Sequence, residues 1–190
     1  MEHLIIYAHP NPKSFNHAIL TAVEERLGRL KKNCVTRDLY GLNFDPVLKN
    51  TDFIALQQGK LPLDIAKEQD YIKRAKTIII IHPIWWFNAP AILKGYIDRV
   101  FSYGFAYAVK EGKLAGLLPD KRIFVFNTTG GGEATYNQAG FAQALKTTID
   151  TGTYGLCGMK VEQHIFFYEV PTVTHEKREA MLAQIKTMNF

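Results

Sequence analysis

Five short runs of apolar residues are spaced along the chain, separated by segments of mixed polarity. Leu4–Ala8, Thr77–Ile81 and Ile123–Phe126 are almost continuously apolar, whereas Val35–Leu39 and Val161–Phe167 also contain polar positions. An unbroken apolar run of this length is typical of a strand buried on both faces, as in a parallel sheet covered by helices. The five runs therefore predict five β-strands.

Helical patterns fill the segments between these runs. They predict helices from Ser14–Asn16 to about Arg29, over Asp64–Lys76, over Ala91–Ser102 behind a first-turn Pro90, from Gln138 to about Ile149, and over His175–Met188. Strand and helix alternate, which implies βαβ crossovers and an open parallel sheet with helices on both faces. Five strands suit the flavodoxin-type order 2-1-3-4-5, so we expect this α/β fold. With no internal repeat or linker, residues 1–190 are expected to form one domain.

Composition narrows the class of protein. The chain has 190 residues, of which 47% are hydrophobic and 22% charged, as in ordinary globular domains. Its net charge of +5 comes from scattered Lys and Arg, so we expect no nucleic-acid partner. The apolar runs fall far short of the ~18 residues of a membrane span. With two distant cysteines and no visible signal peptide, we expect a cytoplasmic protein without an integral membrane segment.

The loops after the first, third and fourth strands are the expected ligand site, because ligands bind where the strand order reverses. The first of these loops, His9–Asn16, is rich in small polar residues and leads into a helix. The free amides and the positive end of that helix favour a phosphate. Ser14 or Asn16 also fits a plain helix cap, and the two roles are compatible.

The loop after the third strand, His82–Pro90, contains three consecutive aromatic residues, Trp85, Trp86 and Phe87. Neighbours in an extended loop cannot all point into the core. Some of these rings must face either a flat aromatic ligand or a partner subunit, and the sequence leaves both alternatives open.

The loop after the fourth strand, Asn127–Glu133, contains three consecutive glycines. Glycine lets the backbone approach a ligand closely and present its N–H groups. A phosphate seat, aromatic walls and a donor-rich edge with little charge together describe a phosphorylated planar heterocycle. Flavin is the natural candidate for such a ligand.

Three stretches carry a resemblance to a known family. They are the spacing of His9, Ser14, Phe15 and Asn16, the run PIWWFNAPAILKGYIDRVFSYGFAY (Pro83–Tyr107), and TTGGGEATY (Thr128–Tyr136). Together they resemble the NAD(P)H:quinone oxidoreductase family, which has a flavodoxin-like fold. The family includes DT-diaphorase, small bacterial quinone reductases and the ancillary subunit of glutathione-gated potassium efflux systems. The resemblance covers nearly the whole chain.

This resemblance implies a homodimer whose two flavin sites lie at the subunit interface. Residues that match flavin-binding positions are His9, Ser14, Phe15, Asn16 and Ala18 at the phosphate arm, Pro83, Ile84, Trp85, Trp86 and Phe87 beside the ring, and Thr128, Thr129, Gly130 and Gly131 at its polar edge. Tyr107 matches an aromatic residue that closes the substrate pocket of the partner subunit in relatives.

The chain departs from DT-diaphorase at the proposed proton relay, which pairs a tyrosine with a histidine six residues later. Tyr136 matches the tyrosine, but Ala142 stands at the histidine position. Tyr136 is therefore the only catalytic candidate, as a hydroxyl donor to the flavin. The chain also lacks the C-terminal extension of the larger relatives, so FMN and FAD are equally credible as a non-covalent cofactor.

By resemblance, we expect an NAD(P)H dehydrogenase that reduces quinones or related acceptors. NAD(P)H would be the co-substrate in a two-electron, ping-pong exchange. A regulatory subunit that docks to a potassium efflux transporter is the alternative. A one-electron carrier like true flavodoxin fits less well, because such carriers are usually strongly acidic. The six histidines show no metal-ligand spacing, so no metal is expected.

Overall fold

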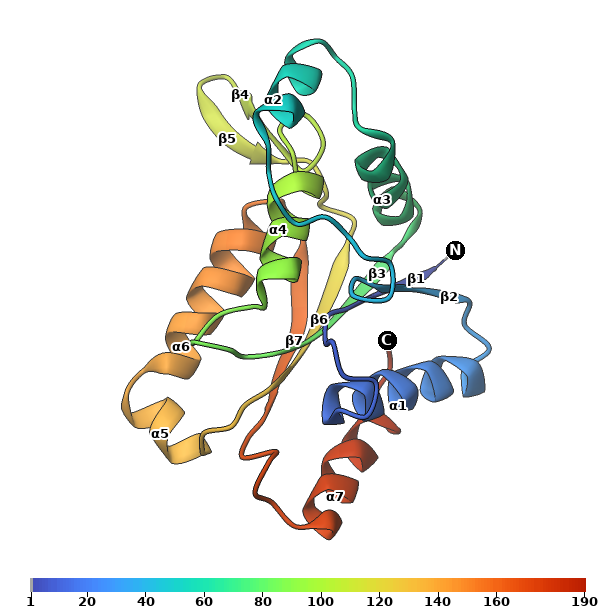
Figure 1. Cartoon of the computed structure of the whole chain (residues 1–190), viewed down its shortest axis with the longest axis vertical. Helices are drawn as coiled ribbons and strands as arrows, with labels where there is room; N and C mark the ends of the chain where they lie inside the picture. The colour runs from blue at the N-terminus through green and yellow to red at the C-terminus, as the bar shows by residue number, and fades with distance from the viewer. Residues whose placement is uncertain (1) are drawn as a thin grey trace.

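The structure is a computed structural model, and it describes residues 2–190. Its centre is a five-stranded sheet with the order β2-β1-β3-β6-β7 (Figure 1). All neighbouring strands are parallel, and the predicted fold class and strand order are confirmed. The strands are β1 (His3–Tyr7), β2 (Cys34–Asp38), β3 (Thr77–Pro83), β6 (Arg122–Thr128) and β7 (Lys160–Phe167).

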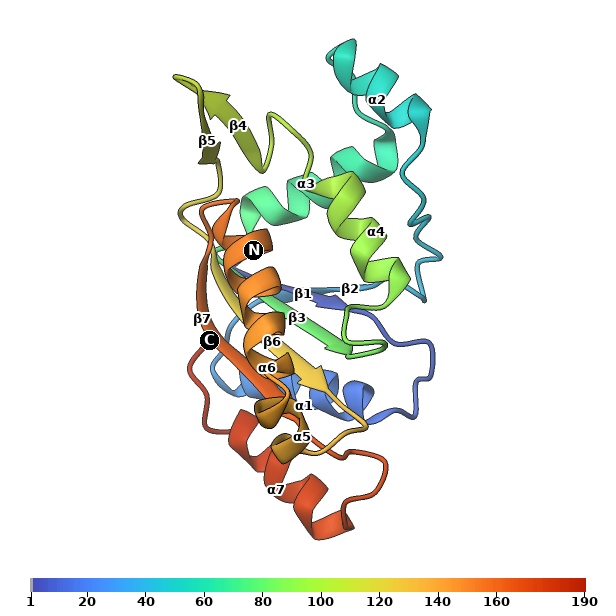
Figure 2. The ribbon, with the colours of Figure 1, turned by 90° about the vertical axis from the view of Figure 1, so that its left-hand side faces the viewer.

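Helices cover both faces of the sheet (Figure 2). One face carries α1 (Phe15–Arg29) and α7 (His175–Ile185). The other face carries α3 (Leu63–Arg74), α4 (Ala91–Val100) and α6 (Phe141–Lys146), which continues into the π-helix η1 (Thr147–Gly155). Within residues 2–190, no helix has the length and apolar character needed to cross a membrane.

The apolar strands build one hydrophobic core on each face of the sheet. Successive side chains of a strand point to opposite faces, so Ile5 packs with the α1 and α7 side and Leu4 with the α3 and α4 side. Both side chains are fully buried. Burial of one such side chain contributes roughly 1.5–3 kcal/mol. The sheet is therefore a rigid base for the loops at its carboxyl edge.

Two elements at one end of the molecule were not predicted from the sequence. They are α2 (Asn50–Gln57) and the hairpin of β4 (Tyr107–Lys110) and β5 (Lys113–Gly116), which lie at the top of Figure 1. The hairpin turns through Glu111 and Gly112, which both have positive φ, as a tight two-residue turn requires. Both elements are short, so their hydrophobic pattern gives little signal.

Arg99 of α4 ties α2 and α3 to the rest of this end. Its guanidinium donates to Asp52 of α2 at 3.0 Å and to Asp64 of α3 at 2.8 Å, and also to the Asp45 carbonyl at 2.8 Å. The Arg99 side chain is only 6% exposed. A buried charge needs such partners, because leaving it unpaired would be strongly destabilising.

The helix predicted from Gln138 to Ile149 is wrong at both ends. The chain forms α5 (Glu133–Gln138), breaks at Gly140, whose φ is 71°, and restarts as α6. That left-handed conformation suits glycine and interrupts a helix. After Lys146 the chain continues as η1 to Gly155, and π-helical turns occur frequently at functional sites.

Candidate active site

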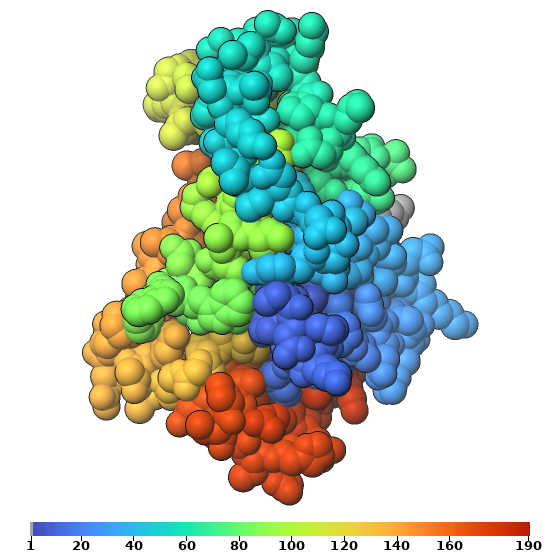
Figure 3. Space-filling view, in the orientation of Figure 1, coloured from blue at the N-terminus to red at the C-terminus, as the bar shows by residue number. Residues whose placement is uncertain are grey.

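A hollow of about 570 Å³ lies at the carboxyl ends of β1, β3 and β6. This volume is within the ~300–1,000 Å³ range of small-molecule sites. In Figure 3 the blue first loop, the green segment after β3 and the red C-terminal segment meet on the face shown. The predicted residues that line the hollow are His9, Ser14, Phe15, Asn16, Pro83, Ile84, Trp85, Trp86, Thr128, Thr129 and Gly130.

The start of α1 forms one side of the hollow. Ser14 caps this helix, and its hydroxyl accepts a hydrogen bond from the His17 N–H at 3.2 Å. The first amides of a helix have no intrahelical partner, so the N–H groups of Phe15 and Asn16 can donate hydrogen bonds to an anion. The first turn contains no acidic residue. Capping and anion binding are therefore compatible here.

His9 lies at the rim of the hollow as a neutral side chain. Its Nδ1 accepts a hydrogen bond from the Asn11 N–H at 3.0 Å, which leaves the ring proton on Nε2. Burial lowers the pKa of His9. Its ring meets the ring of Trp85 edge-on, with centroids 5.6 Å apart. His9 can thus donate a hydrogen bond to a ligand without adding charge.

The aromatic turn, Trp85–Asn88, forms the opposite wall. The Trp85 N–H donates to the Asn88 carbonyl, and the Asn88 N–H donates to the Trp85 carbonyl, both at 3.0 Å. Between them, Trp86 and Phe87 have φ of 50° and 55°. Turns with two positive φ values usually contain Asn and Gly, and bulky residues there cost of order 1–3 kcal/mol each. Such strain concentrates at ligand sites, and the Trp86 side chain is 96% exposed.

The glycine loop forms the third side, and its glycines serve different purposes. A Cβ added at Gly130 would meet nothing within 4 Å, so the backbone there borders open space in the hollow. A Cβ added at Gly131 would lie 3.0 Å from Cε2 of Tyr136. Gly130 therefore leaves room for a ligand, whereas Gly131 leaves room for the Tyr136 ring.

Asn16 supplies an acceptor that the protein itself does not satisfy. Its Nδ2 donates to Thr128 Oγ1 at 2.7 Å, which joins the first loop to the third. Its Oδ1 has no hydrogen-bond partner within residues 2–190, although Asn16 is only 2% exposed. An unpaired buried acceptor is costly. A flavin, with its ring N–H and chain hydroxyls, is a ligand that fits an acceptor in this hollow.

Two predicted residues lie away from the hollow. Ala18 faces a groove between α1 and α7, beside Glu176 and Ala180. Tyr107 begins β4 and lines an apolar cavity under α2 with Phe53. The structure thus does not bring either side chain to the hollow of its own chain.

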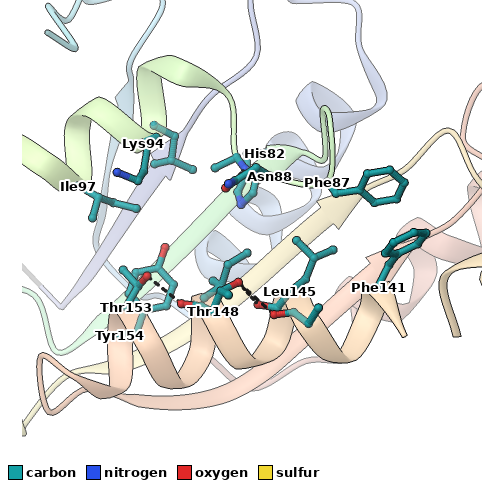
Figure 4. A pocket seen from close by; sticks show the side chains of 14 residues that line it. His82, Phe87, Asn88, Lys94, Ile97, Phe141, Leu145, Thr148, Thr153 and Tyr154 are labelled. Carbon is teal, nitrogen blue, oxygen red and sulfur yellow. Dashed lines mark hydrogen bonds between the residues drawn. The ribbon is translucent and has the colours of Figure 1, made fainter. Parts of the chain in front are cut away.

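Phe87, Gly131 and Tyr136 also lie outside the lining of the hollow, and Phe87 lines a second cavity. This cavity of about 290 Å³ lies between α4 and the α6–η1 segment, and Figure 4 shows Phe87 facing Phe141 at one end of the lining side chains. The two rings are 4.1 Å apart between centroids. Tyr136 packs against Phe87 at 5.7 Å, and burial raises the pKa of the Tyr136 hydroxyl, which therefore keeps its proton.

Val170 and Pro171, which follow β7, also line the hollow and were not predicted from the sequence. The Val170 N–H donates to the Thr129 carbonyl at 3.1 Å, so this segment supports the glycine loop. The predicted strand order could have indicated these two residues. It places the last strand beside the fourth, so the segment that follows the last strand begins at the same edge of the sheet as the glycine loop. No group of three His, Cys, Asp or Glu within residues 2–190 is arranged to hold a metal ion.

Comparisons with known proteins identify relatives along the whole chain. The profile of a family described as "Flavodoxin-like fold" matches residues 1–188. An uncharacterized NAD(P)H oxidoreductase of Haemophilus influenzae is 37% identical, over 96% of this chain and 91% of that protein.

Solved structures of other proteins are similar to this chain in three dimensions. The NAD(P)H:quinone oxidoreductase of Methanothermobacter marburgensis superposes with a TM-score of 0.88 and 29% identity, covering 98% of this chain and 95% of its own. An FMN-dependent NADH-azoreductase of Bacillus anthracis in complex with FMN has a TM-score of 0.75 at 17% identity, over 98% of this chain and 96% of its own, and shares the fold. This chain belongs to the NAD(P)H:quinone oxidoreductase family of the flavodoxin-like fold, as its sequence motifs predicted.

Proposed function

We propose that this chain is a flavin-dependent NAD(P)H oxidoreductase that reduces quinones or related acceptors by two electrons. The observation that carries the proposal is the single hollow shared by the first loop, the aromatic turn and the glycine loop. Its three sides offer free amides at a helix start, flat aromatic surface and the backbone of the glycine loop. This is the combination that a flavin, as FMN or FAD, requires.

Each side of the hollow has a separate task in this proposal. The amides of Phe15 and Asn16 would hold the phosphate, and the Trp85 and Trp86 side would border the ring. The bound flavin would supply the hydride chemistry. The Gly130 amide would stabilise negative charge that develops at the polar edge, and Tyr136 would add its hydroxyl. Those two donors must be held in place in advance, which the packed β6 and β7 loops provide.

Identifying the cofactor is the first test. Protein purified without added flavin should release FMN or FAD on heating, and chromatography of the released compound would distinguish the two. The apoprotein should then take up the same compound with one flavin per chain. A colourless protein that binds neither FMN nor FAD would refute the proposal.

Gly130→Val tests the location of the cofactor. An added Cβ meets no protein atom within 4 Å and Gly130 lines the hollow, so valine there should reduce the space for a ring and leave stability almost unchanged. We expect the flavin Kd to rise at least about tenfold, which is a loss of about 1.4 kcal/mol. Gly28→Val is the matched control, because an added Cβ at Gly28 in α1 also meets nothing within 4 Å. Equal flavin affinity in the two variants would exclude this hollow as the flavin site.

The kinetic order tests the proposed exchange. If NAD(P)H and the acceptor use one site in turn, double-reciprocal plots of initial rate against NAD(P)H concentration, taken at several acceptor concentrations, should be parallel lines. Converging lines would contradict ping-pong exchange.

Sustained turnover with NAD(P)H and a quinone would support an enzyme. The oxidoreductase names of the relatives give no support to the alternative of a regulatory subunit of an efflux transporter. The supply of NAD(P)H and the two free cysteines favour the cytoplasm as the location.

A homodimer is part of the same proposal. Large apolar side chains are exposed on the aromatic turn and on the β4–β5 hairpin, where Val109 is 52% and Leu114 61% exposed. Such surfaces favour a protein partner. In the dimer, Tyr107 would lie over the hollow of the partner subunit. Sedimentation should give twice the chain mass of 21.6 kDa, and Tyr107→Ala should raise the KM for the acceptor.

A further inference from the structure

Behind the hollow, four polar side chains form a continuous hydrogen-bonded relay across three strands. Asp150 Oδ1 lies 2.7 Å from His164 Nδ1, and His164 Nε2 lies 2.7 Å from Asn127 Oδ1. Asn127 Nδ2 lies 3.0 Å from His82 Nε2, and His82 Nδ1 lies 2.9 Å from the Pro83 carbonyl oxygen. The relay therefore runs from η1 through β7, β6 and β3 to the backbone of the hollow.

Three of the four members of this relay are almost completely buried. Asn127 is fully buried, His82 is 1% exposed, and the His164 side chain is 2% exposed. Only Asp150 reaches the surface, with 19% of its side chain exposed. Buried polar groups are kept when every member is satisfied, and such networks fix one geometry.

The partners determine where the protons lie. His82 Nδ1 faces a carbonyl oxygen and must donate, so in the neutral ring Nε2 accepts from Asn127 Nδ2. This orientation of Asn127 turns its Oδ1 toward His164, which must then donate from Nε2. The other nitrogen of His164 faces the Asp150 carboxylate and also donates. The opposite orientation of Asn127 would require two protons on His82, which is fully buried.

The relay ends at the base of the aromatic turn. His82 holds the Pro83 carbonyl, and the next N–H, that of Ile84, donates to the Thr128 carbonyl at 2.8 Å. Trp85 follows directly and opens the turn with positive φ at Trp86 and Phe87. A strained turn persists only where its surroundings over-determine it. Its base is held by β6 through both Asn127 and Thr128.

We propose that Asp150, His164, Asn127 and His82 are positioning residues that fix the Pro83 peptide and thereby aim the aromatic turn. The consequence for the flavin rests on the proposed function, whereas the effect on the turn itself does not. None of the four side chains has to touch the ligand. They act through the backbone that carries Pro83 and Trp85.

The chain provides its own reporter for the test. Its two tryptophans, Trp85 and Trp86, both belong to the aromatic turn, so tryptophan emission of the apoprotein, excited where its nine tyrosines do not absorb, reports on the turn. Asp150→Asn changes the exposed end of the relay, and His82→Leu removes the buried end. Each should shift the emission maximum, and the double variant should shift it no further than the stronger single variant. Such non-additivity is expected when two changes break one connected network.

Tyr96→Phe is the matched control for loss of a buried hydrogen bond. The Tyr96 hydroxyl donates to Glu68 at 3.2 Å, and within residues 2–190 neither side chain is hydrogen-bonded to a member of the relay. It should lower stability and leave tryptophan emission unchanged. If Tyr96→Phe shifts the emission as much as His82→Leu does, the relay has no special connection to the turn. Additive shifts, or no shift in Asp150→Asn, would also overturn the proposal.

Two further readouts separate this inference from the proposed function. Nitrogen NMR of labelled apoprotein should show His82 neutral with its proton on Nδ1, and a proton on Nε2 alone would contradict the relay. In the flavin arm, Asp150→Asn should raise the Kd of the identified flavin about threefold to tenfold. If the wild-type chain binds no flavin, the proposed function fails, and the emission and NMR results still decide whether the relay holds the turn.

Discussion

The first loop and the aromatic turn line the same hollow, but they are built in opposite ways. No residue of the first loop has a positive φ, and its backbone is held by local hydrogen bonds, since the Ser14 hydroxyl accepts from the His17 N–H and the His9 ring accepts from the Asn11 N–H. The aromatic turn places Trp86 and Phe87 in conformations that bulky residues avoid and leaves Trp86 almost fully exposed. A relaxed loop suits a fixed anchor for a charged group. A strained turn indicates that ring placement has been favoured over stability.

Relieving the strain should have the largest effect. Replacing Trp86→Asn together with Phe87→Gly gives the residues that this turn type prefers. We expect the free energy of unfolding to rise by about 2 kcal/mol and the flavin Kd to rise by at least about tenfold. Denaturant titration and flavin titration measure the two quantities.

Leu63→Ser is the control for this pair, because it removes an exposed apolar side chain, 90% exposed, at the start of α3. It should leave flavin affinity unchanged. An aromatic turn that can be replaced with no loss of affinity would show that its strain does not serve flavin binding.

Acid should weaken the base of the turn more than the first loop. Burial lowers the pKa of His82 to about 4, whereas burial lowers that of His9 without so large a shift. Unfolded histidine has a pKa of about 6.5. Between these values the unfolded chain binds more protons than the folded chain, so stability is complete above about pH 6.5 and falls as the pH drops toward 4.

Several charged or titratable groups lie near His82 and affect its titration. His164 of β7 further lowers the pKa of His82, the Asp150 carboxylate of η1 lies 2.7 Å from His164 Nδ1, and Lys94 of α4 lines the same cavity as His82. Buried His3 contributes in the same direction. Denaturant titration at a series of pH values across this range gives the free energy of unfolding as a function of pH. The slope of that dependence should be reduced in His82→Leu and nearly unchanged in His9→Asn. Equal slopes in the two variants would contradict the difference between the regions.

Removing the cap of the first loop should have a moderate effect. Ser14→Ala should lower the free energy of unfolding by about 1 kcal/mol and also weaken flavin binding. Thr174→Ala is the matched control, because Thr174 caps α7 in the same way, accepting from the Lys177 N–H at 3.3 Å. It should cost similar stability and leave the flavin Kd unchanged. Weakened binding in both variants would mean that Ser14 acts only through stability.

Tyr136→Phe should have the smallest effect. The ring still packs against Phe87, so flavin should remain bound. Reduction of the enzyme by NAD(P)H, followed in a stopped-flow instrument, should slow several-fold, as expected for one hydrogen bond of about 1 kcal/mol. Tyr168→Phe removes a neighbouring hydroxyl, with the two rings 5.6 Å apart, and should leave the rate unchanged. An unchanged rate in Tyr136→Phe would remove Tyr136 from the mechanism.

The sequence predicted the sheet and most of the hollow, because both follow from patterns that are local in the chain. Continuous apolar runs such as Thr77–Ile81 can be buried only on two faces, and strand order then brings three distant loops to one edge. Eleven of the predicted residues line the hollow as a result.

The remaining features depend on contacts that no local pattern encodes. The positive φ values at Trp86 and Phe87 oppose the preference of those residues, so the turn type could not be predicted. The relay joins Asp150 to His82 across three strands, and its members are far apart in the sequence. The break at Gly140 had a local signal, because glycine readily adopts a positive φ, yet the π-helix after it had none.

Quenching of tryptophan emission by flavin is the most direct test of the central claim, which is that the ring binds between the aromatic turn and the glycine loop. Titrating the apoprotein with FMN or FAD should quench Trp85 and Trp86 strongly and saturate at one flavin per chain. Gly130→Val should abolish this quenching at the same flavin concentrations. Flavin that binds without changing the emission, or that quenches Gly130→Val as fully as the wild type, would contradict the account.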